Sequence, residues 1–174
     1  MSTKLTRTWQ MPNSNTFSIK PISNLIGKYL SDDMLSIDPF ANISRIAKIT
    51  NDLNPDYKTD FHLDAIDFLK RFETESVDFV LYDPPYSLRQ VSECYKGVGR
   101  EVTMETTQAS WNTAHKSEIK RILKPNGICM CFGWNSNGIG SSDMELIEVL
   151  LVAHGGQHND TIVTVERKVQ GMLL

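Results

Sequence analysis

Short apolar runs that each lead into an aspartate are the feature of this sequence that most constrains its fold. The runs are 34–37, 47–50, 61–63 and 77–82, and the acids that follow them are Asp38, Asp52, Asp64 and Asp83. Apolar residues recur at helical spacing over 22–30, and amphipathic helices are predicted at 65–72 and 106–123. Strands that alternate with helices predict a parallel sheet with helices on both faces.

The C-terminal part of the chain supplies the remaining predicted strands. Segment 128–132 is a fifth apolar run, and the runs 146–153 and 161–165 flank a loop rich in turn-forming residues. We therefore expect an α/β, Rossmann-like fold with a seven-stranded, mostly parallel sheet and a C-terminal antiparallel hairpin. The 174 residues suit one domain. We assign residues 16–174 to it and the polar residues 1–15 to an irregular N-terminal arm.

The four strand-end acids indicate a binding site. In open α/β sheets the ligand lies outside the carboxyl ends of the strands, and an aspartate is rarely buried without a partner. Aspartate is also a common helix cap and turn residue, which explains any one of the four by itself. Their repetition at four strand ends favours the binding site.

Asp83-Pro84-Pro85-Tyr86, directly after the run 77–82, is the sharpest chemical signal. An exocyclic aromatic amine is a weak nucleophile because its lone pair is delocalised into the ring. The Asp83 carboxylate and the Pro84 carbonyl can accept from its two N–H groups and localise that lone pair. Two prolines fix φ near −65° and keep these acceptors aimed. Tyr86 can stack on the base, which must be flipped out or unpaired to reach such a site.

These motifs resemble those of the amino-methyltransferases that act on adenine N6 in DNA, and the resemblance covers most of the chain. Segment 16–22 is similar to the family's motif ten, 38–42 to motif one, 51–53 to motif two and 64–65 to motif three. The resemblance implies S-adenosylmethionine as the cofactor. The residues that it implies for cofactor binding are Phe17, Lys20, Asp38, Pro39, Phe40, Ala41, Asp52, Leu53, Asp64 and Ala65.

The same resemblance implies catalytic roles for Asp83, Pro84, Pro85 and Tyr86. The family lines its target pocket after strand five, which points to Trp134 and Asn135, and its motif eight places His158 near the flipped base. The segment 87–107 is predicted to be a mobile substrate loop with hinges at two glycines. Its candidate substrate-binding residues are Arg89, Tyr95 and Lys96.

Two departures from the family pattern bear on function. Motif one has Ala41 and Asn42 in place of glycines. Asn is the next best residue for a left-handed conformation, so we expect a distorted but usable loop and an effect on cofactor affinity. The chain also has no room for a target recognition domain. We therefore expect loose sequence preference, or recognition by a partner subunit or through a homodimer.

Composition narrows the classes of protein. The net charge of −3 argues against tight, sequence-blind binding of nucleic acid. No apolar run has the length of a membrane span and no signal peptide is evident, so we expect a cytoplasmic protein without a membrane partner. Cys129 and Cys131 are predicted to pack in the core. His154 and His158 lack two further ligands at metal-binding spacing, so no metal site is predicted.

The leading hypothesis is methylation of adenine N6 in DNA by a small enzyme of phage or mobile-element type, with loose sequence preference. One alternative is methylation of an exocyclic amine of an RNA base, adenine or guanine, because small ribosomal-RNA methyltransferases also use an Asp-Pro-Pro-aromatic motif. Another is a degenerate subunit of a methyltransferase complex. The tyrosine at the fourth place of the motif and the Lys20-Pro21 pair upstream favour DNA adenine.

Overall fold

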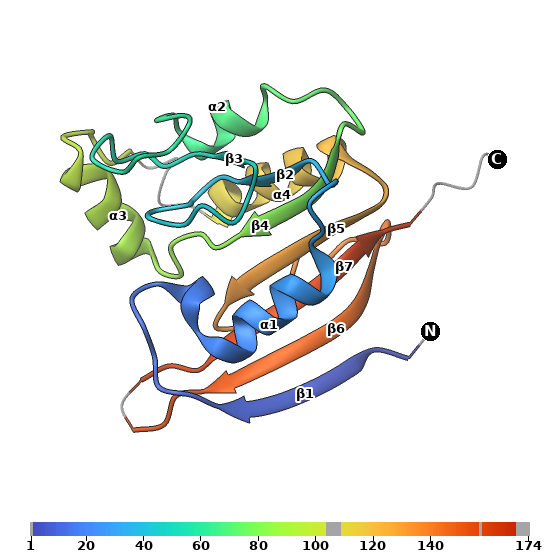
Figure 1. Ribbon diagram of the computed structural model, residues 1–174. Coiled ribbons are helices and arrows are strands. Elements are labelled where there is room, and N and C mark those ends of the chain that lie inside the picture. The colour runs from blue at the N-terminus through green and yellow to red at the C-terminus, as the bar shows by residue number, and fades with distance from the viewer. Residues whose placement is uncertain (1, 104–108, 157, 170–174) are drawn as a thin grey trace.

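A seven-stranded sheet forms the centre of the protein in the computed structural model, which describes residues 2–103, 109–156 and 158–169. The strands are β1 Lys4–Trp9, β2 Ser36–Asp38, β3 Ile49–Thr50, β4 Val77–Tyr82, β5 Leu123–Gly133, β6 Met144–Ala153 and β7 Thr161–Lys168, in the spatial order β1-β6-β7-β5-β4-β2-β3 (Figure 1). Among these strands β7 alone runs antiparallel to its neighbours. The predicted Rossmann-like sheet with a C-terminal antiparallel hairpin is confirmed.

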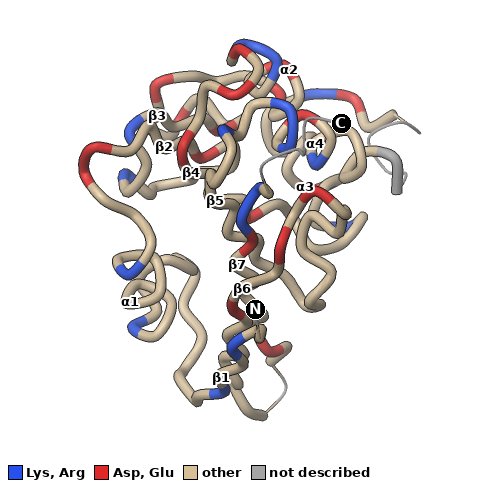
Figure 2. The backbone as a smooth tube through the Cα atoms, turned by 90° about the vertical axis from the view of Figure 1, so that its right-hand side faces the viewer, with Lys and Arg blue, Asp and Glu red and all other residues tan. Residues whose placement is uncertain are grey.

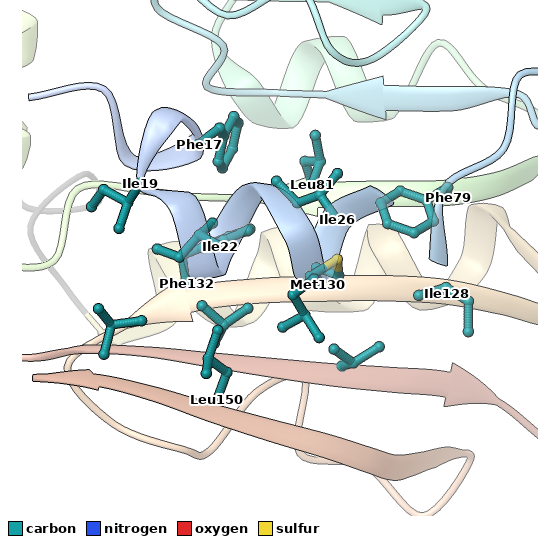
Figure 3. Packing of buried hydrophobic residues seen from close by; sticks show 14 of the residues in the cluster. Phe17, Ile19, Ile22, Ile26, Phe79, Leu81, Ile128, Met130, Phe132 and Leu150 are labelled. Atoms are coloured by element: carbon teal, nitrogen blue, oxygen red, sulfur yellow. The ribbon is translucent and has the colours of Figure 1, made fainter. Parts of the chain in front are cut away.

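Helices cover both faces of the sheet. They are α1 Lys20–Tyr29, α2 Ala65–Leu69, α3 Leu88–Gly97 and α4 Ala109–Ile122, with a short 3₁₀ turn η1 Thr16–Ser18. On one face, Ile22 and Ile26 of α1 pack toward Met130 and Phe132 of β5 (Figure 3). On the other face, α2 and α4 bury apolar side chains against β2, β4 and β5, where Cys129 and Cys131 also lie. These two clusters fix the strands whose carboxyl ends carry the acids.

The sheet has the predicted number of strands but a different membership. The predicted strand 61–63 is reduced to one isolated bridge between Asn51 and Phe61. The seventh strand is β1, which pairs in parallel with β6 at the sheet edge. The prediction of an irregular arm is therefore wrong for Lys4–Trp9. As an edge strand, β1 leaves side chains such as Leu5 and Trp9 exposed, so no buried, alternating pattern marks it in the sequence.

The predicted mobile loop 87–107 is also wrong for its first half, which forms α3. Ser87 caps this helix: its hydroxyl accepts from the Gln90 amide at 3.2 Å, and the Gln90 side chain accepts from the Ser87 amide at 3.2 Å. Val91 and Tyr95, one turn apart, bury the inner face of the helix. Capping and burial thus offset the cost of the two glycines near its end. Residues 104–107 of the predicted loop lie outside the described residues.

Two further boundaries follow from local sequence. The helix predicted at 106–123 is α4, and β5 begins directly after it, so 124–127 belong to the strand as an irregular stretch and not to a separate turn. Asn126 there adopts φ of 67°, the left-handed conformation that asparagine tolerates.

None of the described helices has the length and apolar content to cross a membrane.

Candidate active site

Residues that follow β2, β3 and β4 line a cavity of about 480 Å³ at the carboxyl edge of the sheet. Phe40 comes from the loop after β2, Asp52 and Leu53 from the loop after β3, and Asp83 from the turn after β4. Helix α3 contributes the fourth wall through Glu93 and Cys94. The cavity therefore lies where ligands of open α/β sheets bind.

Asp38 lies buried beneath the first loop of this cavity. One of its carboxylate oxygens accepts from the Phe40 amide at 3.0 Å, while the other has no partner among the described residues. Burial raises the pKa of Asp38 well above its usual value. Asn42, in the position of a motif-one glycine, has φ of 50°. It thus adopts the left-handed conformation that asparagine tolerates, as the sequence predicted.

The carboxylate of Asp52 is held at the cavity wall by backbone groups. Its two oxygens accept from the amides of Asn42 and Asn54, each at 2.9 Å. Because an ionised carboxylate has about four acceptor positions, Asp52 keeps free capacity on the cavity side. Fully buried Asn51, the preceding residue, bonds to the backbone of Pro39 and Leu63 and so joins the neighbouring loops.

Asp64 has a structural partner that the sequence did not predict. One oxygen caps α2 through the Ile66 amide at 3.2 Å, and the other accepts from the Tyr95 hydroxyl. Tyr95 lines, with Leu53 and Trp111, an adjoining cavity of about 60 Å³. This geometry places Tyr95, a candidate substrate residue, on the Asp52–Asp64 side of the site and away from Trp134.

Asp83 is a carboxylate on which burial and hydrogen bonds act in opposite directions. Burial raises its pKa to about 6, although hydrogen bonds from the hydroxyls of Tyr86 and Thr16 stabilise the ionised form. Two of its acceptor positions are thereby used, and the others are available to a ligand in the cavity. Above pH 6 this side chain is a fixed, mostly ionised acceptor.

The turn 84–86 is a wall between two cavities. Besides the larger cavity, Pro84, Pro85 and Tyr86 line a second one of about 150 Å³. Trp134 and Asn135, which follow β5, lie on its far side, and the rings of Tyr86 and Trp134 pack edge to face with centroids 5.6 Å apart. Ligands in the two cavities would therefore meet at this turn.

The structure brings some of the predicted site residues together and leaves others apart. Phe17 is buried against the Phe132 ring, 4.9 Å away, and lines a cavity of about 120 Å³ with Asp83 and Ala41. Five candidates line none of the cavities described above; they are Asp38, which is fully buried, and Lys20, Arg89, Lys96 and His158, which are exposed. Arg89 instead pairs with Glu93 at 2.8 Å.

Three residues that sequence reasoning did not single out lie at the site. Thr16 bonds to Asp83 and lines the larger cavity. Asn112 and Lys116 of α4 line the 150 Å³ cavity. Their i,i+4 spacing places them on one face of the helix, a signal that the sequence carried but that gains meaning only once α4 is placed against β4 and β5.

Charge is not segregated on this protein. Figure 2 shows basic and acidic residues interspersed along the chain, in line with the net charge of −3. Within the described residues, no group of three or more His, Cys, Asp or Glu side chains is placed to hold a metal ion.

No protein-family model and no curated protein sequence matches the chain. Among solved structures it is similar to TrmN from Thermus thermophilus (TM-score 0.59, 17% identity), with 87% of this chain and 49% of that one covered. A 1,6-didemethyltoxoflavin-N1-methyltransferase from Burkholderia thailandensis, with bound S-adenosylhomocysteine, has a TM-score of 0.58 at 12% identity, covering 87% and 78%. The N-methyltransferase NodS from Bradyrhizobium japonicum WM9, in complex with S-adenosyl-L-homocysteine, has a TM-score of 0.57 at 11% identity, with 91% of this chain and 90% of that one covered.

These likenesses show the fold. The chain has the Rossmann-like fold of these methyltransferases, and it spans about half the length of the TrmN chain.

Replacing Tyr86 by Phe should raise the pKa of Asp83 above 6. The hydroxyl of Tyr86 donates to the ionised carboxylate, so its loss favours the protonated form. A ¹³C NMR titration of the Asp83 side-chain carboxyl measures the shift. Tyr57→Phe, a change in the same cavity away from Asp83, is the control and should leave the pKa unchanged. An unchanged or lower pKa in Tyr86→Phe would contradict the assigned contact.

Proposed function

We propose that the chain transfers a methyl group from S-adenosylmethionine to the exocyclic N6 amine of adenine in DNA. The observation that carries the proposal is the Asp83–Tyr86 turn, which follows β4 at the carboxyl edge. Asp83 lines the larger cavity, and residues 84–86 form the wall that this cavity shares with the smaller one. The larger cavity is of the size that small-molecule cofactors occupy. The smaller one offers a separate place for an acceptor ring.

The residues of the larger cavity fit S-adenosylmethionine. Asp52 keeps acceptor positions for ribose hydroxyls, and Leu53 and Phe40 offer apolar surface for the adenine. Asp38 is fully buried beneath this cavity and does not line it, and its unpartnered oxygen is an acceptor of the kind that a ligand amino group would satisfy. The cofactor supplies an electrophilic methyl group on a positively charged sulfur. Several carboxylates around one cavity suit that charge.

Asp83 acts in this proposal on the charge that develops at the acceptor. An amine becomes cationic as it takes a methyl group, so a fixed carboxylate stabilises the transition state more than the ground state. The hydroxyls of Tyr86 and Thr16 hold Asp83 ionised against its burial. The carbonyl of Pro84 is the second acceptor of the amine, and the prolines keep its direction fixed.

Asp52→Ala should weaken S-adenosylmethionine binding by about 1.5–3 kcal/mol, the range for a hydrogen bond to a charged group. Isothermal titration calorimetry measures this. Asp56→Ala removes an exposed carboxylate four residues away that lines none of the cavities, and it should bind as the wild type does. Equal affinity of the two variants would remove Asp52 from the cofactor site.

Transfer of a labelled methyl group from S-adenosylmethionine should be found in DNA, as N6-methyladenine after digestion to nucleosides. Single-stranded DNA, duplex DNA and RNA are compared side by side, and unpaired DNA should be modified fastest because no base pair has to be opened. Label confined to RNA would replace DNA by RNA as the substrate. Binding of S-adenosylmethionine without label in any nucleic acid would favour the degenerate-subunit alternative.

A further inference from the structure

A partly buried hydrogen-bond chain joins α4 to β4 beside the turn 83–86. Tyr82, which directly precedes Asp83, donates its hydroxyl hydrogen to the Asn112 side-chain oxygen at 3.1 Å. The Nδ1 atom of fully buried His115 lies 3.3 Å from the same hydroxyl. Since the Tyr82 hydrogen is directed to Asn112, His115 must supply its own hydrogen to the Tyr82 oxygen.

The surroundings of His115 support that direction. Burial lowers the pKa of His115 to about 4, so the ring is neutral and carries one N–H. Its Nε2 atom has no partner among the described residues. A buried N–H without an acceptor is rarer than a buried acceptor without a donor, so the hydrogen belongs on Nδ1. In this chain His115 therefore donates to the Tyr82 oxygen, and the Tyr82 hydroxyl donates to the Asn112 oxygen.

This chain determines what α4 presents to the 150 Å³ cavity. The Tyr82 hydroxyl takes one of the two acceptor positions of the Asn112 oxygen and holds that oxygen toward β4, while the NH₂ group of exposed Asn112 can donate to a ligand. Lys116, one helical turn later, lines the same cavity and carries an ammonium group, which only donates. The α4 wall of the cavity therefore offers a hydrogen-bond donor from each of these two residues.

We propose that this cavity takes the acceptor base and that Asn112 and Lys116 recognise its ring nitrogens. The inference rests on the proposed function, because the turn 84–86 lines this cavity too. In adenine the exocyclic amine is flanked on both sides by acceptors, N1 and N7. In guanine the N2 amine is flanked by N1–H, a donor that would face another donor. The two donors of the α4 wall therefore favour adenine over guanine.

Equilibrium binding of fluorescent single-stranded oligothymidylates tests the inference without relying on catalysis. Each oligonucleotide carries one central adenine, guanine, 1-deazaadenine or 7-deazaadenine, and anisotropy is measured with S-adenosylhomocysteine present. The adenine oligonucleotide should bind roughly 2- to 12-fold more tightly than an analogue that loses the Asn112 contact, the range for one neutral hydrogen bond, and by a larger factor than one that loses the contact to charged Lys116. Asn112→Ala and Lys116→Met should each abolish the difference between adenine and at least one deaza analogue.

Matched controls separate recognition from general effects. Asn24→Ala on α1 and Lys70→Met after α2 change exposed residues outside the cavity and should retain the full preference. Tyr82→Phe frees the Asn112 amide to rotate and should weaken the preference although Asn112 remains. Asn112→Ala also removes the acceptor of the buried Tyr82 hydroxyl, so its thermal melting is compared with that of Tyr82→Phe to separate a loss of stability from a loss of recognition.

Wild-type protein that binds all four oligonucleotides equally, or none, would overturn the inference. A preference that survives in both Asn112→Ala and Lys116→Met would overturn it too. Methyl transfer to the same oligonucleotides keeps the two proposals apart. Adenine preference in binding without methyl transfer would reject the proposed reaction and retain this recognition. Methyl transfer without the preference would reject this recognition alone.

Discussion

The hydrogen bonds of the Asn51 side chain are the interaction on which the Asp52–Asp64 side of the cavity depends. This side chain is fully buried just past β3, and its amide donates to the carbonyls of Pro39 and Leu63, both at 3.0 Å, and accepts from the Leu63 amide at 2.9 Å. Each partner adjoins a site residue: Phe40 follows Pro39, and Asp64 follows Leu63. Loss of this amide would leave buried backbone groups unpaired, at about 1–3 kcal/mol for each.

Two opposing effects act on the charge of Asp83. Burial raises its pKa and so favours the neutral form, whereas two hydroxyl donors stabilise the ionised form. The donors come from distant parts of the chain, Thr16 before α1 and Tyr86 within the turn itself. The N-terminal part thus contributes to the electrostatics of β4 as well as to the sheet edge. This arrangement gives a partly buried carboxylate that is mostly ionised at neutral pH, where an ionic interaction is stronger than in bulk water.

The sequence predicted what depends on buried strands and their ends. Both ends of strand β4 were predicted correctly because its six residues form a continuous run of buried or half-buried side chains. The acids that follow the strands lie near one another because parallel strands end at the same edge of the sheet. The edge strand β1 was missed because it buries little. Helix α3 was missed because its two glycines outweighed the capping box at Ser87. Asn112 and Lys116 depend on how α4 packs, which periodicity alone does not fix.

Single-turnover methyl transfer to an adenine-containing oligonucleotide, with saturating cofactor and with Asp83 replaced, tests the central claim most directly. Asp83→Ala should lose about 10²- to 10³-fold in rate, the scale for one preorganised electrostatic group. Asp83→Asn keeps an acceptor oxygen without the charge and should retain part of the activity, with cofactor affinity little changed in both. A near-wild-type rate in Asp83→Ala would contradict the account.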